Sequence, residues 1–300
     1  MDNANAGSAA SPQPMKGSSL TQRVLSVLVL LPIIMLVVWW NYWAVAVFVG
    51  GVVVIALIEL YATFSHGGYQ PLTWVGIPSG LLLLLSVVLR PLKLPFDLLP
   101  PALVVMIISS LLATLPRDRE PQTLVSWALT FAGTFYVAWL FSYLVALRGL
   151  DTPLRAGPLA SLGMPAGAAW LFTVMAVTWL QDTFAYFVGK RWGRAKMAPT
   201  LSPKKTWEGA AGGFFGAVVG ALLSVVVFCL PISFGAAVLL GVVGGIVGPL
   251  GDLAESLMKR QLGLKDAGNL IPGHGGVLDR GDSLLFTAPV LYYLILLLVR

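Results

Sequence analysis

Residues 233–260 read SFGAAVLLGVVGGIVGPLGDLAESLMKR, and this stretch decides how the chain is organised. Its first 19 residues carry no charge, and an uncharged apolar run of about 18 residues or more is typical of a membrane-spanning helix. If that helix continues past the apolar run, the polar residues that follow recur at i, i+3, i+4 and i+7 and share one face. These residues are Asp252, Glu255, Ser256 and Lys259.

The composition extends this interpretation to the whole chain. Hydrophobic residues make up 57% of the 300 residues, charged residues make up 11%, and the mean hydropathy is +0.85. Soluble domains carry about 25% charged residues, so this composition excludes a soluble globular protein. Apolar segments fall at about 24–40, 43–64, 72–89, 98–115, 123–147, 167–188, 209–230, 233–251 and 283–299. We therefore predict an all-α, polytopic integral membrane bundle with about nine transmembrane helices.

Three parts follow from this pattern. Residues 1–21 are rich in Ala, Ser, Pro, Gly and Asn and predict a disordered cytoplasmic tail. Residues 22–166 form the N-terminal transmembrane helices, and residues 167–300 form a C-terminal transmembrane region that holds most of the clustered charge. Cys229 is the chain's one cysteine and lies in an apolar run, so the sequence predicts no internal disulfide.

The basic residues indicate the orientation. With the N-terminus in the cytoplasm, 14 Lys and Arg residues fall on the inner side and 5 on the outer side, as the positive-inside rule requires. Residues 189–208 and 252–282 then lie on the cytoplasmic side. The net charge of +6 is explained by such loops or by an anionic substrate, so we expect no nucleic-acid partner.

These two stretches hold 16 of the 32 charged residues in 51 positions. Solvated loop faces would explain the basic residues, but they explain the interleaved acids poorly, because acids contribute little to orientation. A carboxylate at the membrane boundary, Asp252, followed two turns later by Lys259, suits a site that binds a metal ion and phosphate. The alternative is a network of salt bridges within one helix.

Residues 271–282 read IPGHGGVLDRGD. Glycines around His274 allow the backbone to approach a ligand closely, and consecutive N–H groups in such a loop can bind an anion. Asp279 follows as a second candidate metal ligand. Asp282 precedes the last apolar segment, where helix capping and catalysis are equally open.

Two further features are candidates for the same site. Residues 202–209 read SPKKTWEG, and lysines and hydroxyls before a helix N-terminus suit a phosphate clamp. Asp182 lies inside an apolar segment, and such carboxylates are functional candidates by default. Glu59 also lies within an apolar segment, but near a helix end and without a motif, so we expect a structural role. The sequence has no P-loop, and its two histidines exclude a His-rich zinc site.

The run from Ser256 to Asp282 resembles the signature of the phosphatidate cytidylyltransferases, a pattern of 27 positions. The segment around Asp182 and residues 202–209 also look like stretches of that family, so the resemblance covers about residues 179–282. Gly281 departs from the pattern, because the family usually has a bulky apolar residue there. The packing before the last span is therefore an open question.

The resemblance implies that a cytidylyl group passes from CTP to phosphatidic acid, giving CDP-diacylglycerol and pyrophosphate. It also implies Mg²⁺ held by Asp252 and Asp279, with a paired K⁺ as a further option. We expect catalytic roles for Asp252, Lys259, Asp279 and Asp282. The expected substrate-binding residues are Asp182, Ser202, Lys204, Lys205, Thr206, Glu208, Ser256, Arg260, Lys265, Asp266, His274, Gly275, Gly276 and Arg280.

Two other functions stay open at this point. A transferase acting on a different lipid-linked acceptor would use the same scaffold. A transporter would explain intramembrane charge such as Asp182, with a pathway along the glycines of segment 233–251. The sequence also leaves a homodimer open.

Overall fold

A computed structural model describes residues 20–117, 119–264, 267–268 and 275–299, with the backbone alone for residues 20–27. The predicted tail lies almost wholly outside the described residues. The helices are α1 (Leu20–Trp40), α2 (Tyr42–His66), α3 (Thr73–Val88), α4 (Leu99–Leu112), α5 (Thr123–Thr134), α6 (Leu140–Arg148), α7 (Pro158–Ser161), α8 (Ala166–Trp192), α9 (Trp207–Phe228), α10 (Phe234–Gln261) and α11 (Leu278–Leu298). Short 3-10 turns at Arg90–Leu92 and Leu115–Arg117 flank α4, and a π-helical turn at Phe135–Trp139 joins α5 to α6.

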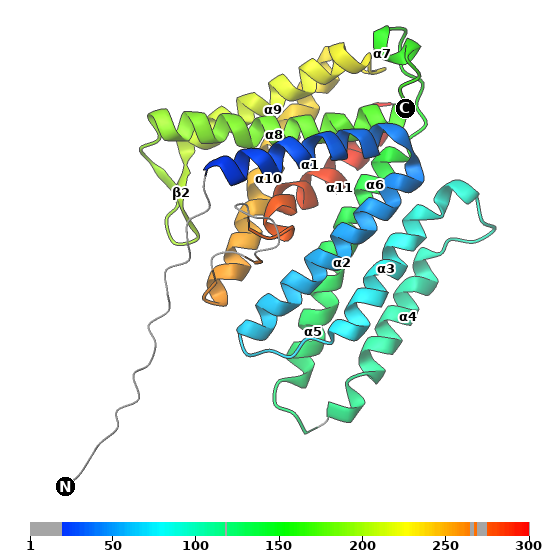
Figure 1. Cartoon of the computed structure of the whole chain (residues 1–300), viewed down its shortest axis with the longest axis vertical. Coiled ribbons are helices and arrows are strands. Elements are labelled where there is room, and N and C mark those ends of the chain that lie inside the picture. The colour runs from blue at the N-terminus through cyan, green and yellow to red at the C-terminus, as the bar shows by residue number, and fades with distance from the viewer. Residues whose placement is uncertain (1–19, 118, 265–266, 269–274, 300) are drawn as a thin grey trace.

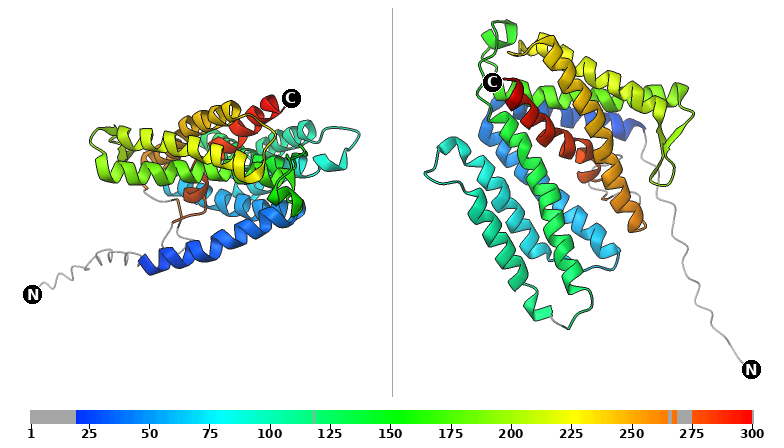
Figure 2. Two further views of the ribbon diagram at one scale, coloured as in Figure 1. Left: turned by 90° about the horizontal axis from the view of Figure 1, so that it is seen from above. Right: turned by 180° about the vertical axis from the view of Figure 1, so that it is seen from behind.

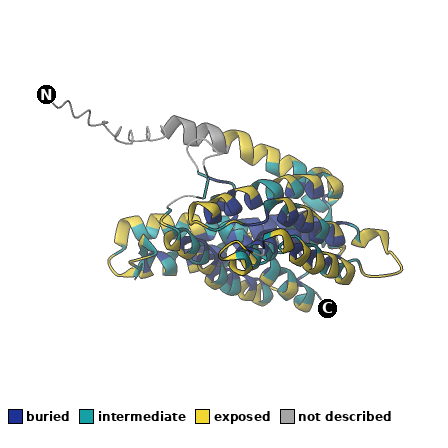
Figure 3. Ribbon diagram, turned by 90° about the horizontal axis from the view of Figure 1, so that it is seen from below, coloured by how far each residue is buried: buried dark blue, intermediate teal, exposed yellow. Residues whose placement is uncertain are grey.

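The helical membrane architecture is confirmed. Every predicted apolar segment is helical, and seven helices among the described residues are long and apolar enough to cross a bilayer. The apolar part Leu28–Trp40 and the helix Thr73–Val88 are shorter, so the number of nine spans stays a prediction. Large apolar side chains such as Val47 and Phe215 are exposed, and Figure 3 shows exposed residues along the outer faces of the helices. Such continuous apolar exposure suits a lipid environment.

The sequence interpretation missed one element. Strands β1 (Lys196–Ala198) and β2 (Ser202–Thr206) form an antiparallel hairpin between α8 and α9. Thr206 ends β2 and also caps α9, because its Oγ1 accepts a hydrogen bond from Gly209 N at 3.1 Å. The hairpin therefore has a fixed direction relative to the helix that follows it.

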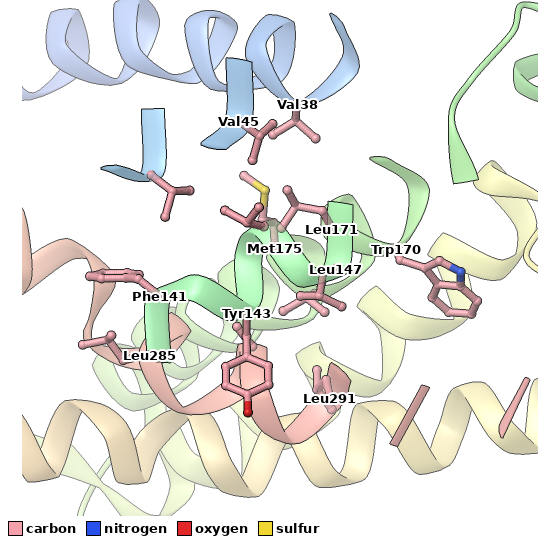
Figure 4. Packing of buried hydrophobic residues seen from close by; sticks show 14 of the residues in the cluster. Val38, Val45, Phe141, Tyr143, Leu147, Trp170, Leu171, Met175, Leu285 and Leu291 are labelled. Atoms are coloured by element: carbon pink, nitrogen blue, oxygen red, sulfur yellow. The ribbon is translucent and has the colours of Figure 1, made fainter. Parts of the chain in front are cut away.

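The helices form two groups (Figures 1 and 2). Helices α2, α3, α4 and the continuous α5–α6 rod run alongside one another, and the α8–α9 pair crosses that group. Helix α10 packs against both α9 and α11, and α11 packs against α6. Side chains of α1, α2, α6, α8 and α11 meet in one buried cluster, including Val45, Phe141, Leu171 and Leu291 (Figure 4).

Small residues let these helices approach closely, as is common in membranes. Along α9, glycines at a spacing of four, three and four residues face α8, namely Gly209, Gly213, Gly216 and Gly220. A Cβ atom at Gly220 would lie 2.9 Å from Ala176 O, closer than real contacts allow. The α10 glycines are used in the same way: Gly241 and Gly245 contact α9, Gly244 and Gly248 contact both α8 and α11, and Gly251 contacts α11. These glycines therefore pack helices together, which removes their support for a transport pathway.

The departure at Gly281 also has a packing explanation. Gly281 lies on α11 against the ring of Phe141 on α6, and a Cβ atom there would overlap the ring. Both residues are buried. The phenyl ring thus fills the space that a bulky residue at position 281 would need.

Candidate active site

The continuation of α10 beyond its apolar run brings its polar residues onto one face, as predicted. The helix extends ten residues beyond the predicted apolar run, to Gln261. Ser256 Oγ donates to Asp252 Oδ1 at 3.3 Å, and Lys259 Nζ donates to Glu255 Oε1 at 2.9 Å. The side chain of Glu255 is 1% exposed, so this part of α10 is covered by protein.

Lys259 also joins α10 to α11. Its Nζ lies 2.6 Å from Asp279 Oδ1, while its contact with Glu255 is kept. The predicted salt bridge within one helix is therefore present, but it is part of a bridge between two helices. A single ammonium compensates two carboxylates that are almost fully buried, with Asp279 6% exposed.

Two backbone N–H groups complete the surroundings of Asp279. Gly276 N donates to its Oδ2 at 2.8 Å, and Ala267 N donates to the same oxygen at 3.0 Å. Gly275 has φ +84°, a left-handed conformation that glycine adopts without strain. This turn aims the Gly276 amide at the carboxylate, so the glycine-rich segment here binds the protein's own anion.

The hairpin supplies a second lysine. Lys205 on β2 forms an ion pair with Asp252 Oδ2 at 2.7 Å and donates to Pro249 O at 3.2 Å. Arg260 fixes the other side of the hairpin, because its Nε donates to Leu201 O at 3.2 Å. The hairpin is thus attached to α10 at two points, and Lys205 lies beside Asp252.

The remaining candidate residues of the hairpin either stabilise its position or face solvent. Glu208 accepts hydrogen bonds from the backbone N–H groups of Arg194 and Ala195, and it holds the hairpin against the start of α9. Thr206 is buried and used as the cap. Ser202 is partly buried and Lys204 is exposed on β2, where a ligand can reach the lysine.

A third aspartate lies beside Asp252. Helix α11 begins at Leu278, so Asp282 is inside the helix, and the capping hypothesis is wrong. Gly251 packs against the backbone carbonyl of Asp282, which places the two aspartates next to each other on α10 and α11. Asp182 on α8 is close enough for its charge to repel both, while Lys205 and Arg280 oppose that repulsion.

The structure therefore brings most of the predicted residues together around the hairpin, α10 and the start of α11. Lys265, Asp266 and His274 lie outside the described residues, and Arg280 is exposed on α11. The sequence interpretation missed Tyr136, whose buried hydroxyl group lies in the π-helical turn near Glu255 and Asp282 and has no hydrogen-bond partner in the described part of the chain. No sequence pattern marks it, because only the tertiary fold brings the α5–α6 rod against α11.

The oxygen donors of this site suit a hard divalent cation. Among the described residues, no group of three or more Asp, Glu, His or Cys side chains has the geometry of a metal site. Mg²⁺ commonly uses only one or two carboxylates, together with water and substrate phosphates. Asp252 and Asp279 each form an ion pair with a lysine ammonium, so both carboxylates bind a cation in this structure. The donor chemistry thus fits Mg²⁺.

Known proteins match this chain over most of its length. The model of the cytidylyltransferase family matches residues 21–298. A phosphatidate cytidylyltransferase of Synechocystis is 34% identical over 293 residues, which cover 93% of this chain and 97% of that protein.

Two further relatives with the same name match over a shorter region. The Bacillus subtilis protein is 41% identical over 162 residues, and the Brucella abortus protein is 44% identical over 161 residues. These two matches span about half of each relative's length, 55% and 54%. The resemblance predicted from residues 179–282 is confirmed and extends over nearly the whole sequence. This chain belongs to the cytidylyltransferase family.

Proposed function

We propose that this protein transfers a cytidylyl group from CTP to phosphatidic acid, giving CDP-diacylglycerol and pyrophosphate. The observation that carries the proposal is the meeting of three segments in a member of this family. Lys205 of the hairpin reaches Asp252 of α10, and Lys259 of α10 reaches Asp279 of α11. Alternating cations and carboxylates at a membrane boundary suit two polyanionic substrates.

The chemistry follows from these charges. An oxygen of the phosphatidic acid phosphate attacks the α-phosphorus of CTP, a new P–O bond forms, and the bond to the β-phosphate breaks. Pyrophosphate leaves with the bonding electrons. Negative charge grows on the oxygens around the α-phosphorus, so the exposed Lys204 and Arg280 and the half-buried Lys205 bind and orient the phosphates.

We further propose that Asp252 and Asp279 hold Mg²⁺, with Asp282 as an additional carboxylate beside Asp252. The bound ion would offset the charge on the phosphates of CTP. The Asp252 carboxylate is 33% exposed and would be open to the ion, whereas Asp279 would exchange its contact with Lys259 for it. A companion K⁺ ion is tested by replacing K⁺ with Na⁺ in the assay.

A site built on helices that are apolar enough to cross a membrane also fits a lipid acceptor. The positive-inside pattern supports a cytoplasmic site, where CTP arrives from water. The acyl chains then remain in the bilayer, which avoids about 0.8 kcal/mol for each CH₂ group moved into water. A homodimer stays a prediction that mass measurement of the detergent-extracted protein would test.

The test is an assay of the purified protein with CTP labelled at the α-phosphate. The acceptor panel contains phosphatidic acid, an ether-linked analogue and a polyprenyl phosphate. We expect labelled CDP-diacylglycerol and unlabelled pyrophosphate in equal amounts. Phosphatidic acid should be preferred over the other two acceptors. Preference for the polyprenyl phosphate would assign a different acceptor. Movement of label across a proteoliposome without pyrophosphate release would refute the transferase.

A further inference from the structure

One strip of α2 faces the connection between α10 and α11. Its residues are spaced at i, i+4 and i+8: Glu59 and Thr63 lie on α2, and Gly67 is the C-cap of that helix. Thr63 Oγ1 donates to Ala267 O at 3.4 Å, and the side chain of Leu262 packs directly on Gly67. The last turns of α2 therefore contact the described parts of this connection.

Glu59 makes the most specific of these contacts. Its Oε1 accepts a hydrogen bond from Val277 N at 3.1 Å, and its Oε2 accepts one from Leu278 N at 2.9 Å. These are the first amides of α11, which lack partners within the helix. Glu59 is 7% exposed, so a buried carboxylate faces the positive end of the α11 dipole.

Glycines on both sides enclose the same carboxylate. A Cβ atom at Gly268 would lie 2.5 Å from Glu59 Oε1, and one at Gly276 would lie 2.6 Å from Oε2. Side chains at these positions would displace the carboxylate. The Glu59 carboxylate thus lies between Gly268 and Gly276, two glycines of the connection between α10 and α11.

The backbone at and next to these two glycines also binds Asp279. Ala267, next to Gly268, and Gly276 each donate a backbone N–H to the Asp279 carboxylate. That carboxylate in turn pairs with Lys259. Contacts therefore run from Glu59 through the two backbone segments to Asp279, although Glu59 itself comes from the N-terminal half of the chain.

We propose that Glu59 is a positioning residue for Asp279. It holds the start of α11 and the glycines beside it, so that the Ala267 and Gly276 amides and Lys259 keep Asp279 in one orientation. The role assigned to Asp279 rests on the proposed function, but the positioning itself is a property of the fold. Glu59 acts through the backbone and does not contact substrate.

The first test is hydrogen–deuterium exchange of the full-length protein in detergent. Glu59→Gln keeps the shape of the side chain but leaves one carbonyl oxygen for two amides and turns an N–H donor towards the other. Gly268→Ala disturbs the same contact from the opposite side. In both variants, the backbone amides of residues 275–280 should exchange at least about tenfold faster than in the wild type, which is equivalent to about 1.4 kcal/mol. The amides of α8 should keep their protection.

Two matched controls should leave this exchange unchanged. Glu120→Gln removes an exposed carboxylate whose ion pair with Arg117 lies on the surface. Gly51→Ala adds a methyl group on the same helix as Glu59, at a glycine with open space around its Cβ position. If α2 and α8 lose protection together with residues 275–280 in both test variants, Glu59 is a general core residue and the proposal is wrong.

The second test is turnover. A misplaced catalytic group costs roughly 10- to 100-fold in rate, so Glu59→Gln should lower kcat by that factor. The KM for CTP should stay within about threefold, because the lysines and arginine that bind phosphate are not moved directly. Wild-type exchange and wild-type kcat in both variants would overturn the proposal. A wild-type protein that makes no CDP-diacylglycerol, but shows the expected exchange changes, would refute the proposed function and leave the positioning intact.

Discussion

Replacing Lys259 with methionine removes the ammonium that bridges Glu255 and Asp279 and leaves a side chain of similar length. The carboxylates are 1% and 6% exposed, so neither can recover full hydration. Glu255 Oε2 already has no hydrogen-bond partner among the described residues, so the variant would leave that carboxylate without compensation. Breaking a buried ion pair on one side costs about 3–5 kcal/mol, and we expect Lys259→Met to lose that much free energy of unfolding.

Lys205→Met is the natural comparison. Its ion pair with Asp252 is 23% and 33% exposed, and such pairs contribute about 0–1 kcal/mol. Both variants should lose turnover by about 100-fold or more, because each removes a cation beside a site carboxylate. The unfolding free energy should separate them, and the double variant Lys259→Met with Glu255→Met should recover part of the lost stability without recovering turnover.

The assays are SDS-induced unfolding in mixed micelles and turnover of labelled CTP. Lys259→Met with wild-type stability would show that the bridge does not compensate the two carboxylates. Turnover within about threefold of wild type in the same variant would remove Lys259 from the catalytic site.

Three other predictions test separate parts of the site. Asp252→Asn should abolish turnover and leave the unfolding free energy within about 1 kcal/mol, because the side chain is partly exposed; calorimetry and the CTP assay measure both. Treatment with EDTA should stop turnover and added Mg²⁺ should restore it, whereas activity that survives chelation would contradict the metal assignment. Gly281→Leu should lower stability by about 1–3 kcal/mol through overlap with Phe141, and adding Phe141→Ala should relieve part of the loss; no change in the thermal midpoint would refute the packing explanation.

Local sequence patterns were enough to predict the helices and one face of the candidate site. Long uncharged runs have no stable arrangement in a bilayer other than a helix or a closed barrel, so composition and length predicted the membrane helices. The spacing from Asp252 to Lys259 predicted a shared face, because 3.6 residues per turn is a property of the backbone alone. The signature between Ser256 and Asp282 identified the family.

Contacts between distant segments depended on the tertiary structure. Lys259 pairs with Asp279, Lys205 with Asp252, and Glu59 with the first amides of α11, and none of these pairs is visible as a spacing in the sequence. The role of Asp282 changed because α11 begins five residues earlier than its apolar run. Hydrophobicity and helical period act along one segment, whereas charge compensation and amide capping depend on which segments pack together.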